Sequence, residues 1–231
     1  MTEQEIIRIL EESGALLTGH FQLRSGLHSN RFFQAALLLQ YPDKAETVCR
    51  FLAEQYKNEK IDAVISPAVG GLIVGQEVAR ALGCRAIFAD KEDGQLVLKR
   101  GFSIKPGDRI LVAEDVVTKG GRVQQTIDLA RSFGAEIVGI AVIVDRSGGD
   151  AKFDVPFKSA LKLSLPTFDP AECPMCIWKK CIDRWCLNGI KLWSRWSCRK
   201  NKGEGIRGYK LFIFRLSQWK TFSAWSRRLD R

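Results

Sequence analysis

Two acidic residues at the end of an apolar run mark the segment of this sequence best suited to chemistry. An apolar stretch within residues 109–113 leads into Glu114 and Asp115, and residues 116–122 contain two consecutive glycines. This order predicts a buried strand, two carboxylates at its end, a loop and a helix N-terminus. The loop N–H groups and the helix dipole favour a phosphate monoester, which glycines allow to approach closely. The carboxylates could accept hydrogen bonds from sugar hydroxyls or hold Mg²⁺ indirectly. The alternative is a generic strand-to-helix turn that ends in solvated acids.

The elements that must position this segment alternate between strands and helices. The sequence predicts strands at 61–65, 84–89, 109–113 and 137–144, with helices at 72–82 and 123–133. Strands that are apolar on both faces and alternate with helices are typical of an α/β fold, in which helices cover both faces of a parallel sheet. Ligands of such folds bind at the carboxyl ends of the strands. The charged residues 90–101 predict an exposed loop or ribbon.

Before residue 61 the sequence predicts two helices around a segment of turns and strands. Thr2 and Glu5 fit a capping box at the start of a helix that ends near Gly14. Residues 15–40 have the character of turns and strands, and Pro42 opens the next helix.

Charge is distributed unevenly over the 231 residues. The net charge is +10, yet residues 177–231 hold 15 Lys and Arg against 3 Asp and Glu, so residues 1–176 carry −2. The basic excess is therefore poor support for a nucleic-acid partner. No stretch approaches the roughly 18–20 apolar residues of a membrane span, so we expect no membrane partner either. The N-terminus lacks a secretory signal and the seven cysteines are an odd number, which together predict a cytoplasmic location.

Residues 109–122 resemble the phosphoribosyl-diphosphate signature of the type I phosphoribosyltransferases: an apolar strand, two acids, two apolar residues, Thr, one residue and Gly-Gly. Six flanking segments are similar to the orotate phosphoribosyltransferases, namely residues 14–21, 23–26, 31–33, 66–71, 145–149 and 166–176. The resemblance extends over about residues 1–176. It implies the type I phosphoribosyltransferase fold, with a central parallel sheet flanked by helices and a small N-terminal hood.

The resemblance implies transfer of the phosphoribosyl group from phosphoribosyl diphosphate to orotate in pyrimidine synthesis, with Mg²⁺ as cofactor. The products are orotidine 5′-monophosphate and diphosphate. The transition state is oxocarbenium-like, so the protein must align the reactants and neutralise developing charge. The resemblance also implies a homodimer, in which a mobile loop closes over the neighbouring subunit's site. That loop corresponds to residues 89–101, where Lys91 is the best match to a diphosphate-binding lysine, and Lys99 and Arg100 are weaker matches.

The same resemblance implies the roles of individual residues, with Asp115 and Lys91 as catalytic ones. Glu114 and Asp115 match the acidic pair that orients the ribose hydroxyls. Phosphoribosyl diphosphate would further contact Val116, Val117, Thr118, Lys119, Gly120, Gly121 and Arg122, and its diphosphate would contact Ala68 and Val69. Orotate would contact Thr118, Arg146, Phe32, Phe33 and Arg24. A guanidinium such as that of Arg146 can hold the orotate carboxylate with two hydrogen bonds.

These residues also have plain structural interpretations. Arg146 could form a surface ion pair with Asp145 or Asp150. One of the two phenylalanines could simply pack in the core. A single lysine in a charged loop is usually just solvated, so the role of Lys91 depends on the resemblance.

Three departures from the family pattern concern the site. Lys119 and Arg122 replace two hydroxyl residues, which keeps the backbone donors but removes a helix-cap hydroxyl. Some members have a lysine where Gly70 stands. Many have a histidine in the mobile loop, whereas this sequence has only His20 and His28, outside that loop. These departures leave two alternatives open, namely an enzyme with altered turnover and a family member without catalytic activity.

Residues 177–231 form a basic tail that contains all six Trp and lies outside the resemblance. Cys173, Cys176, Cys181 and Cys186 could form a zinc knuckle. The basic and aromatic residues could instead bind single-stranded nucleic acid or an anionic membrane surface. An altered reading frame after Cys176 is the interpretation that the loss of Pro and the burst of Trp, Cys and Arg favour, and the tail could be disordered.

Three functions are consistent with the sequence. The first is orotate phosphoribosyltransferase activity of a domain over residues 1–176. The second is transfer to a purine or another base, against which the N-terminal segment and Arg146 argue. The third is a phosphoribosyl-diphosphate sensor with little catalytic activity that binds nucleic acid through its tail.

Overall fold

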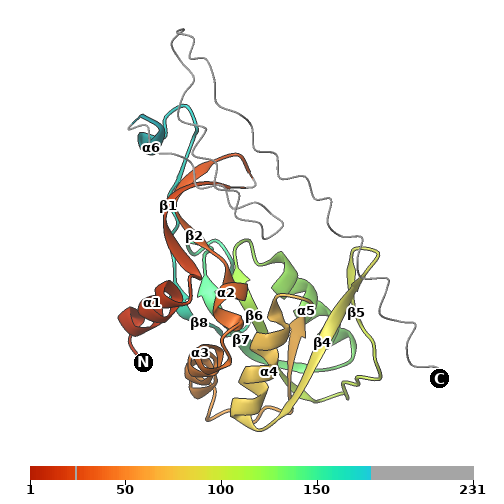
Figure 1. Ribbon diagram of the computed structural model, residues 1–231. Helices are drawn as coiled ribbons and strands as arrows, with labels where there is room; N and C mark the ends of the chain where they lie inside the picture. The colour runs from red at the N-terminus through yellow and green to blue at the C-terminus, as the bar shows by residue number, and fades with distance from the viewer. Residues whose placement is uncertain (24, 178–231) are drawn as a thin grey trace, which may run out of the picture. The chain divides into compact units, whose positions relative to one another are not determined.

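A six-stranded sheet lies at the centre of the computed structural model, which describes residues 1–23 and 25–177 (Figure 1). Its strands are β3 (Ala63–Pro67), β4 (Arg85–Glu92), β5 (Gln95–Leu98), β6 (Arg109–Val117), β7 (Glu136–Asp145) and β8 (Phe157–Lys162). They lie in the order β5-β4-β3-β6-β7-β8. Neighbouring strands are parallel except for β4 and β5, which form an antiparallel ribbon. The predicted α/β fold is confirmed.

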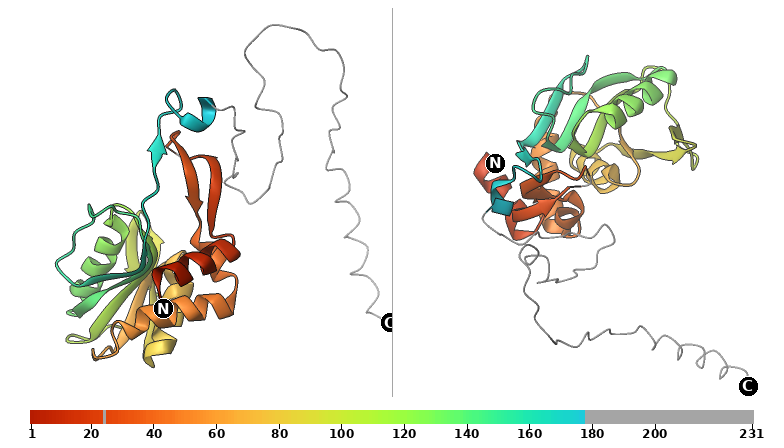
Figure 2. Two further views of the ribbon diagram at one scale, coloured as in Figure 1. Left: turned by 90° about the vertical axis from the view of Figure 1, so that its left-hand side faces the viewer. Right: turned by 90° about the horizontal axis from the view of Figure 1, so that it is seen from above.

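Helices cover both faces of this sheet, as the apolar strands predict (Figure 2). One face packs against α1 (Glu3–Glu12), α3 (Pro42–Glu54) and α4 (Gly71–Leu82), and the other against α5 (Gly121–Ser132). Successive side chains of a strand point to opposite faces. In β6, Leu111 therefore belongs to the first core and Ile110 and Val112 to the second, and all three are fully buried.

The N-terminal helix begins as its sequence predicts. The Thr2 hydroxyl accepts a hydrogen bond from the Glu5 N–H, and the Thr2 N–H donates to the Glu5 carboxylate at 2.7 Å. This capping box satisfies two backbone donors of the first turn. Ile6 and Leu10 then face the core.

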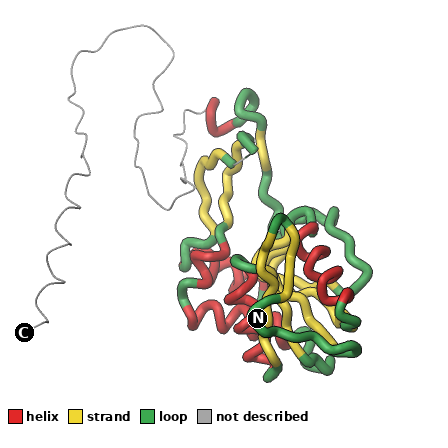
Figure 3. Tube along the Cα trace, turned by 90° about the vertical axis from the view of Figure 1, so that its right-hand side faces the viewer, coloured by secondary structure: helices red, strands yellow, loops and turns green. Residues whose placement is uncertain are grey.

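A second, three-stranded sheet forms the hood (Figure 3). It joins β1 (Leu16–Gln22) and β2 (His28–Phe33) to β9 (Thr167–Phe168), in the order β1-β2-β9 with antiparallel pairing. The Ser29 hydroxyl donates to the Pro166 carbonyl at 2.8 Å, next to β9. After β9 the chain turns into the short helix α6 (Pro174–Ile177). The hood thus combines the first and last described parts of the chain.

Some boundaries differ from those that the sequence predicts. Helix α2 (Ala35–Leu39) lies in the segment expected to hold turns and strands. Five residues are too few to show a helical period, and its buried side chains depend on tertiary packing. β6 runs to Val117, so the two acidic residues lie within the strand rather than after it. β8 and β9 are also additions to the predicted pattern. In the described part of the chain, no helix has the length and apolar character needed to span a membrane.

Candidate functional site

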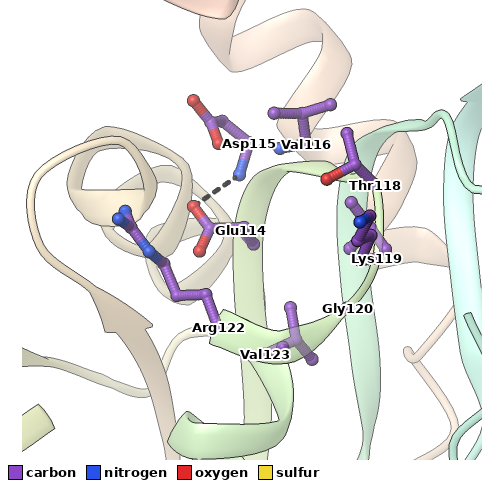
Figure 4. Close-up of a pocket in the computed structure, with 10 residues that line it drawn as sticks. Glu114, Asp115, Val116, Thr118, Lys119, Gly120, Arg122 and Val123 are labelled. Atoms are coloured by element: carbon purple, nitrogen blue, oxygen red, sulfur yellow. Dashed lines mark hydrogen bonds between the residues drawn. The ribbon is translucent and has the colours of Figure 1, made fainter. Parts of the chain in front are cut away.

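A pocket of about 220 Å³ lies at the carboxyl end of β6 (Figure 4). It is lined by the consecutive residues 114–123, which comprise the end of β6, the following loop and the first turn of α5. The sequence places its candidate phosphate site in these same residues. The structure therefore brings them around one cavity at the strand end where ligands of parallel sheets bind.

The loop enters α5 through a glycine in the left-handed conformation. Gly120 has φ of +78°, and a Cβ at this position would lie 2.8 Å from Cζ of Phe153. Both the backbone angle and the close neighbour therefore require glycine. Among the described residues no side chain caps this helix end, so the N–H groups of its first turn remain available for an anion. Thr118, Lys119 and Arg122 are exposed around them.

The two acidic residues differ strongly in environment. Glu114 is 2% exposed, and its Oε1 accepts the Asp115 N–H at 3.2 Å. Oε2 is buried and has no hydrogen-bond partner in the described ranges. Burial, and secondarily the neighbouring Asp115, raise the pKa of Glu114 to about 9. Asp115 is half-buried, and its Oδ1 accepts the Val116 N–H at 2.7 Å.

Arg122, in the first turn of α5, is a cation of the pocket that acts on Glu114. Its side chain extends along the side of the pocket on which Glu114 lies (Figure 4). Its charge lowers the pKa of Glu114, but by less than burial and Asp115 together raise it. Without a ligand, Glu114 is therefore held in its neutral form near pH 7.

The loop between β3 and α4 lies directly against the acidic pair. A Cβ on Gly70 would lie 2.8 Å from Oδ2 of Asp115, and one on Gly71 would lie 3.2 Å from Oε1 of Glu114. Two consecutive glycines thus let this loop approach the end of β6. The peptide bond between Ala68 and Val69 is cis, and the Ala68 N–H donates to the Ala89 carbonyl at 2.8 Å. Sequence reasoning did not identify Gly70 as a steric partner of Asp115, although the Gly-Gly pair was a signal for it.

Arg146 lies beside the loop after β6. Its N–H donates to the Val117 carbonyl at 2.8 Å, which fixes the residue at the end of β7. Within residues 1–23 and 25–177 it forms no ion pair, and its Nε is buried without a hydrogen-bond partner. Asp145 instead accepts hydrogen bonds from the Ser147 N–H and hydroxyl at 2.9 and 2.7 Å. The alternative of an ion pair with Asp145 or Asp150 is not found, and burial lowers the pKa of Arg146.

The β4–β5 ribbon carries the candidate lysine of the mobile loop. Lys99 pairs with Glu92 at 2.6 Å, and Arg100 pairs with Asp90 at 2.9 Å. Lys91 is exposed and forms no ion pair with any residue of the described ranges. The two weaker candidates are thus occupied within the ribbon, whereas the ammonium of Lys91 remains available to an anion.

The two phenylalanines of β2 lie in different environments. Phe33 is buried in the core with α1 and α3, which matches the plain packing expected for one of the pair. Phe32 is half-buried and packs against Phe21, with ring centroids 5.6 Å apart. Arg24, the remaining orotate candidate, lies outside the described residues, as do Cys181, Cys186 and the rest of the tail from residue 178.

The residues at the strand end fit the Mg²⁺ that the resemblance implies. Mg²⁺ prefers oxygen ligands and is commonly held by one or two carboxylates together with substrate phosphates. Asp115, which is half-buried, places such oxygens in the pocket beside the exposed residues Thr118 and Lys119.

Comparison with known proteins identifies the class. A family model for the phosphoribosyl transferase domain matches residues 39–169, so the fold is that of a type I phosphoribosyltransferase. The chain is 47% identical over 176 residues to the orotate phosphoribosyltransferase of Desulforamulus reducens, with 76% of this chain and 92% of that protein covered. It is also 47% identical over 171 residues to the Thermotoga maritima enzyme of the same name, with 74% and 91% covered.

The structural comparison agrees with the sequence relatives. The crystal structure of orotate phosphoribosyltransferase from Aeropyrum pernix matches with a TM-score of 0.59 and 27% identity, covering 68% of this chain and 93% of that one. The chain belongs to the orotate phosphoribosyltransferase family.

Proposed function

We propose that this chain transfers the 5-phosphoribosyl group of phosphoribosyl diphosphate to orotate. A C–N bond forms between the ribose anomeric carbon and an orotate ring nitrogen, which loses its proton to solvent, while the C–O bond breaks and diphosphate leaves with the electron pair of that bond. The products are orotidine 5′-monophosphate and diphosphate. The observation that carries the proposal is the pocket over residues 114–123, with an acidic pair, a helix N-terminus that no described side chain caps, and Arg146, which pairs with no described residue, beside it.

Each part of this site has a role that follows from its chemistry. The first-turn N–H groups of α5, together with Lys119 and Arg122, would hold the 5′-phosphate. Asp115 would accept hydrogen bonds from the ribose hydroxyls and stabilise the cationic transition state. Arg146 would bind the orotate carboxylate through both arms of its guanidinium. The loop at Ala68 and Val69 would receive the diphosphate.

The proposed reaction also requires a Mg²⁺ ion and a second copy of this chain. Mg²⁺ bound through the diphosphate would neutralise the charge of the leaving group. Lys91, on the exposed ribbon, would contact the diphosphate from a neighbouring subunit in a homodimer. The ammonium of Lys91 supports this role, because it has no ion pair among the described residues, whereas Lys99 and Arg100 on the same ribbon are paired.

The assay is the loss of orotate absorbance on addition of phosphoribosyl diphosphate and Mg²⁺. Asp115→Asn should lower kcat/KM by about 10²-fold, the scale for loss of one positioned electrostatic group. Asp128→Asn is the matched control, because Asp128 is an exposed carboxylate on α5 that accepts from Gln124. No orotate consumption by the wild type would refute the proposal, and binding of phosphoribosyl diphosphate alone would then favour a sensor.

We propose that the catalytic domain comprises residues 1–176. The relatives support a domain of this length, because the alignment to the Desulforamulus reducens enzyme spans 176 residues. A chain ending at Cys176 should therefore consume orotate at the same rate as the full chain. Loss of activity on this truncation would assign the tail a catalytic or structural role.

The altered reading frame after Cys176 is tested by peptide mapping of the native protein. If peptides of residues 177–231 are recovered from wild-type cells, that hypothesis is disproved.

A further inference from the structure

Four side chains with metal-binding atoms meet in the hood, outside the phosphoribosyl pocket. They are His20, His28, Cys173 and Cys176, and their ligand atoms all lie within 4.8 Å of one another. The two histidines and Cys173 are at most 3% exposed, and Cys176 is half-buried. We propose that these residues form a structural Zn²⁺ site of the Cys₂His₂ type.

Local structure directs the ligands toward one point. The register of β1 against β2 shifts between Thr18 and Phe21, so His20 lies in a β-bulge. Bulges re-aim side chains out of the regular alternation of a strand. His28 opens β2 and pairs with Gln22. The hairpin therefore presents both imidazoles on one side, with their rings 4.8 Å apart and edge to face.

The two thiols come from a tight turn at the other end of the domain. The Cys176 N–H donates to the Cys173 carbonyl at 3.0 Å, and Pro174 opens α6 between them. A Cys-x₂-Cys turn is a common spacing of paired zinc ligands. The pairing of β2 with β9 leads this turn back to the hairpin, and Figures 1 and 2 show α6 beside it.

The distances are difficult to explain by hydrogen bonds alone. Nε2 of His20 lies 3.0 Å from Nδ1 of His28, 3.5 Å from Sγ of Cys173 and 3.7 Å from Sγ of Cys176. An imidazole nitrogen offers one in-plane proton or one lone pair, so it forms one good hydrogen bond rather than three. Three close partners around one nitrogen indicate instead that these atoms surround a common centre.

The same distances fit the edges of a zinc tetrahedron. Zn–S bonds of about 2.3 Å and Zn–N bonds of about 2.0–2.1 Å give edges of about 3.5 Å between N and S and about 3.3 Å between two N atoms. Three of the four N–S distances are 3.5, 3.7 and 3.3 Å, the last between Cys176 and His28, and every pair of ligand atoms lies within 4.8 Å. The N–N distance of 3.0 Å is slightly shorter, and a bound ion would separate the two rings by a few tenths of an ångström.

The ligand set defines the metal and its role. Two thiolates and two imidazoles in tetrahedral positions are typical of Zn²⁺. Four protein ligands leave no open position, so the site is structural rather than catalytic. Cys173 and His20 are 153 residues apart in the sequence, and the ion would therefore join the N-terminal hairpin to the end of the domain. This set differs from the knuckle considered from the sequence, because the histidines replace Cys181 and Cys186.

The first measurement is the metal content of the full chain, purified under reducing conditions without chelator and analysed by mass spectrometry of elements. We expect about one zinc per chain. Replacement by Co²⁺ should give the intense visible absorption of a tetrahedral site, together with thiolate charge-transfer bands. A chelator strong enough to remove zinc should lower the melting temperature, and added Zn²⁺ should restore it. A chain without zinc that also fails to bind added Zn²⁺ or Co²⁺ would overturn the proposal.

Variants distinguish this site from the knuckle. His20→Ala, His28→Ala and Cys173→Ser should each lose the zinc, whereas the double variant Cys181→Ser with Cys186→Ser should retain it. Cys84→Ser is the control for loss of a half-buried thiol elsewhere. Circular dichroism of each variant shows whether the α/β body still folds. Zinc that persists in the His20→Ala, His28→Ala double variant, or that is lost with Cys181 and Cys186, would overturn the assignment. A wild-type Co²⁺ spectrum without tetrahedral bands would overturn it even if every variant misfolds.

Discussion

Gly70 lies against the carboxylate of Asp115. A Cβ on Gly70 would be 2.8 Å from Oδ2, 3.1 Å from Cγ and 3.2 Å from Oδ1 of that side chain. A real Cβ does not lie this close to another heavy atom, so a side chain at position 70 would displace the Asp115 carboxylate. The loop before α4 therefore limits the space in which that carboxylate can lie. The loop between β3 and α4 and the acidic pair are therefore geometrically coupled.

Substitution of Gly70 tests this coupling. Gly70→Ala should displace the Asp115 carboxylate and lower kcat/KM for orotate by about 10- to 100-fold, the scale for small misplacements of a catalytic group. Its backbone φ of −58° is ordinary, so the melting temperature should change little. Gln76→Ala, at an exposed position of the same helix, is the control. Unchanged kinetics of Gly70→Ala would show that Asp115 can adjust freely.

Arg146 should determine the affinity for orotate rather than for phosphoribosyl diphosphate. Arg146→Lys keeps the charge but loses the planar pair of donors, so the KM for orotate should rise by about 10-fold or more. The KM for phosphoribosyl diphosphate should stay within about twofold of the wild type. Arg131→Lys, which alters an exposed ion pair with Asp154, is the control. Equal changes in both KM values would contradict a specific contact with the orotate carboxylate.

Glu114 should make the stability of the ligand-free protein depend on pH. Its pKa is about 9 in the folded state, against about 4.3 when unfolded. Between these values the unfolded chain has released the proton that the folded chain keeps, so stability decreases as pH rises from about 5 to 9. The decrease is at most about 1.4 kcal/mol per pH unit.

Urea denaturation at several pH values measures this effect. Glu114→Gln removes the titrating group, so its stability should fall less steeply with pH than that of the wild type. Glu11→Gln, on the exposed face of α1, should leave the wild-type slope. Parallel profiles of Glu114→Gln and wild type would mean that Glu114 is ionised in the folded state.

Lys91 should act across the subunit interface. The variants Lys91→Ala and Asp115→Asn should each be nearly inactive alone. In a mixed dimer, the Lys91→Ala subunit supplies a wild-type Asp115 and the Asp115→Asn subunit supplies a wild-type Lys91, so one of the two sites is complete. A random mixture should thus regain about a quarter of wild-type activity. Lys99→Ala, which removes an ion pair within the ribbon, should not show this complementation. A mixture as inactive as its parents would place Lys91 at its own subunit's site.

The sequence predicts the parts of this structure that depend on local pattern. Apolar runs identify the central strands, and the residue types from Glu114 to Arg122 identify the pocket that they line. The short helix over residues 35–39 was not predicted, because it depends on burial against α3 rather than on its own periodicity. The sequence pattern also does not predict which residues that are far apart in the chain lie close together in space.

Two such pairs underlie the proposals made above. Gly70 and Asp115 lie on different strand–helix units, and only the packing of α4 on the sheet brings them together. His20 and Cys173 are separated by almost the whole domain, so the spacing of cysteines alone suggested partners in the tail. In both cases the sequence singles out the individual residues, but the topology of the fold determines which of them are neighbours in space.

The pairing of β2 with β9 has a consequence for synthesis of the chain. Ser29 and Pro166 are 137 residues apart, so the hood cannot close until nearly the whole domain has left the ribosome. Until then the edge of β2 that later receives β9 has unpaired backbone groups, which can pair with another nascent chain. Closure of the hood is therefore a late event, and the speed with which the last residues reach the hairpin determines how long that edge stays open.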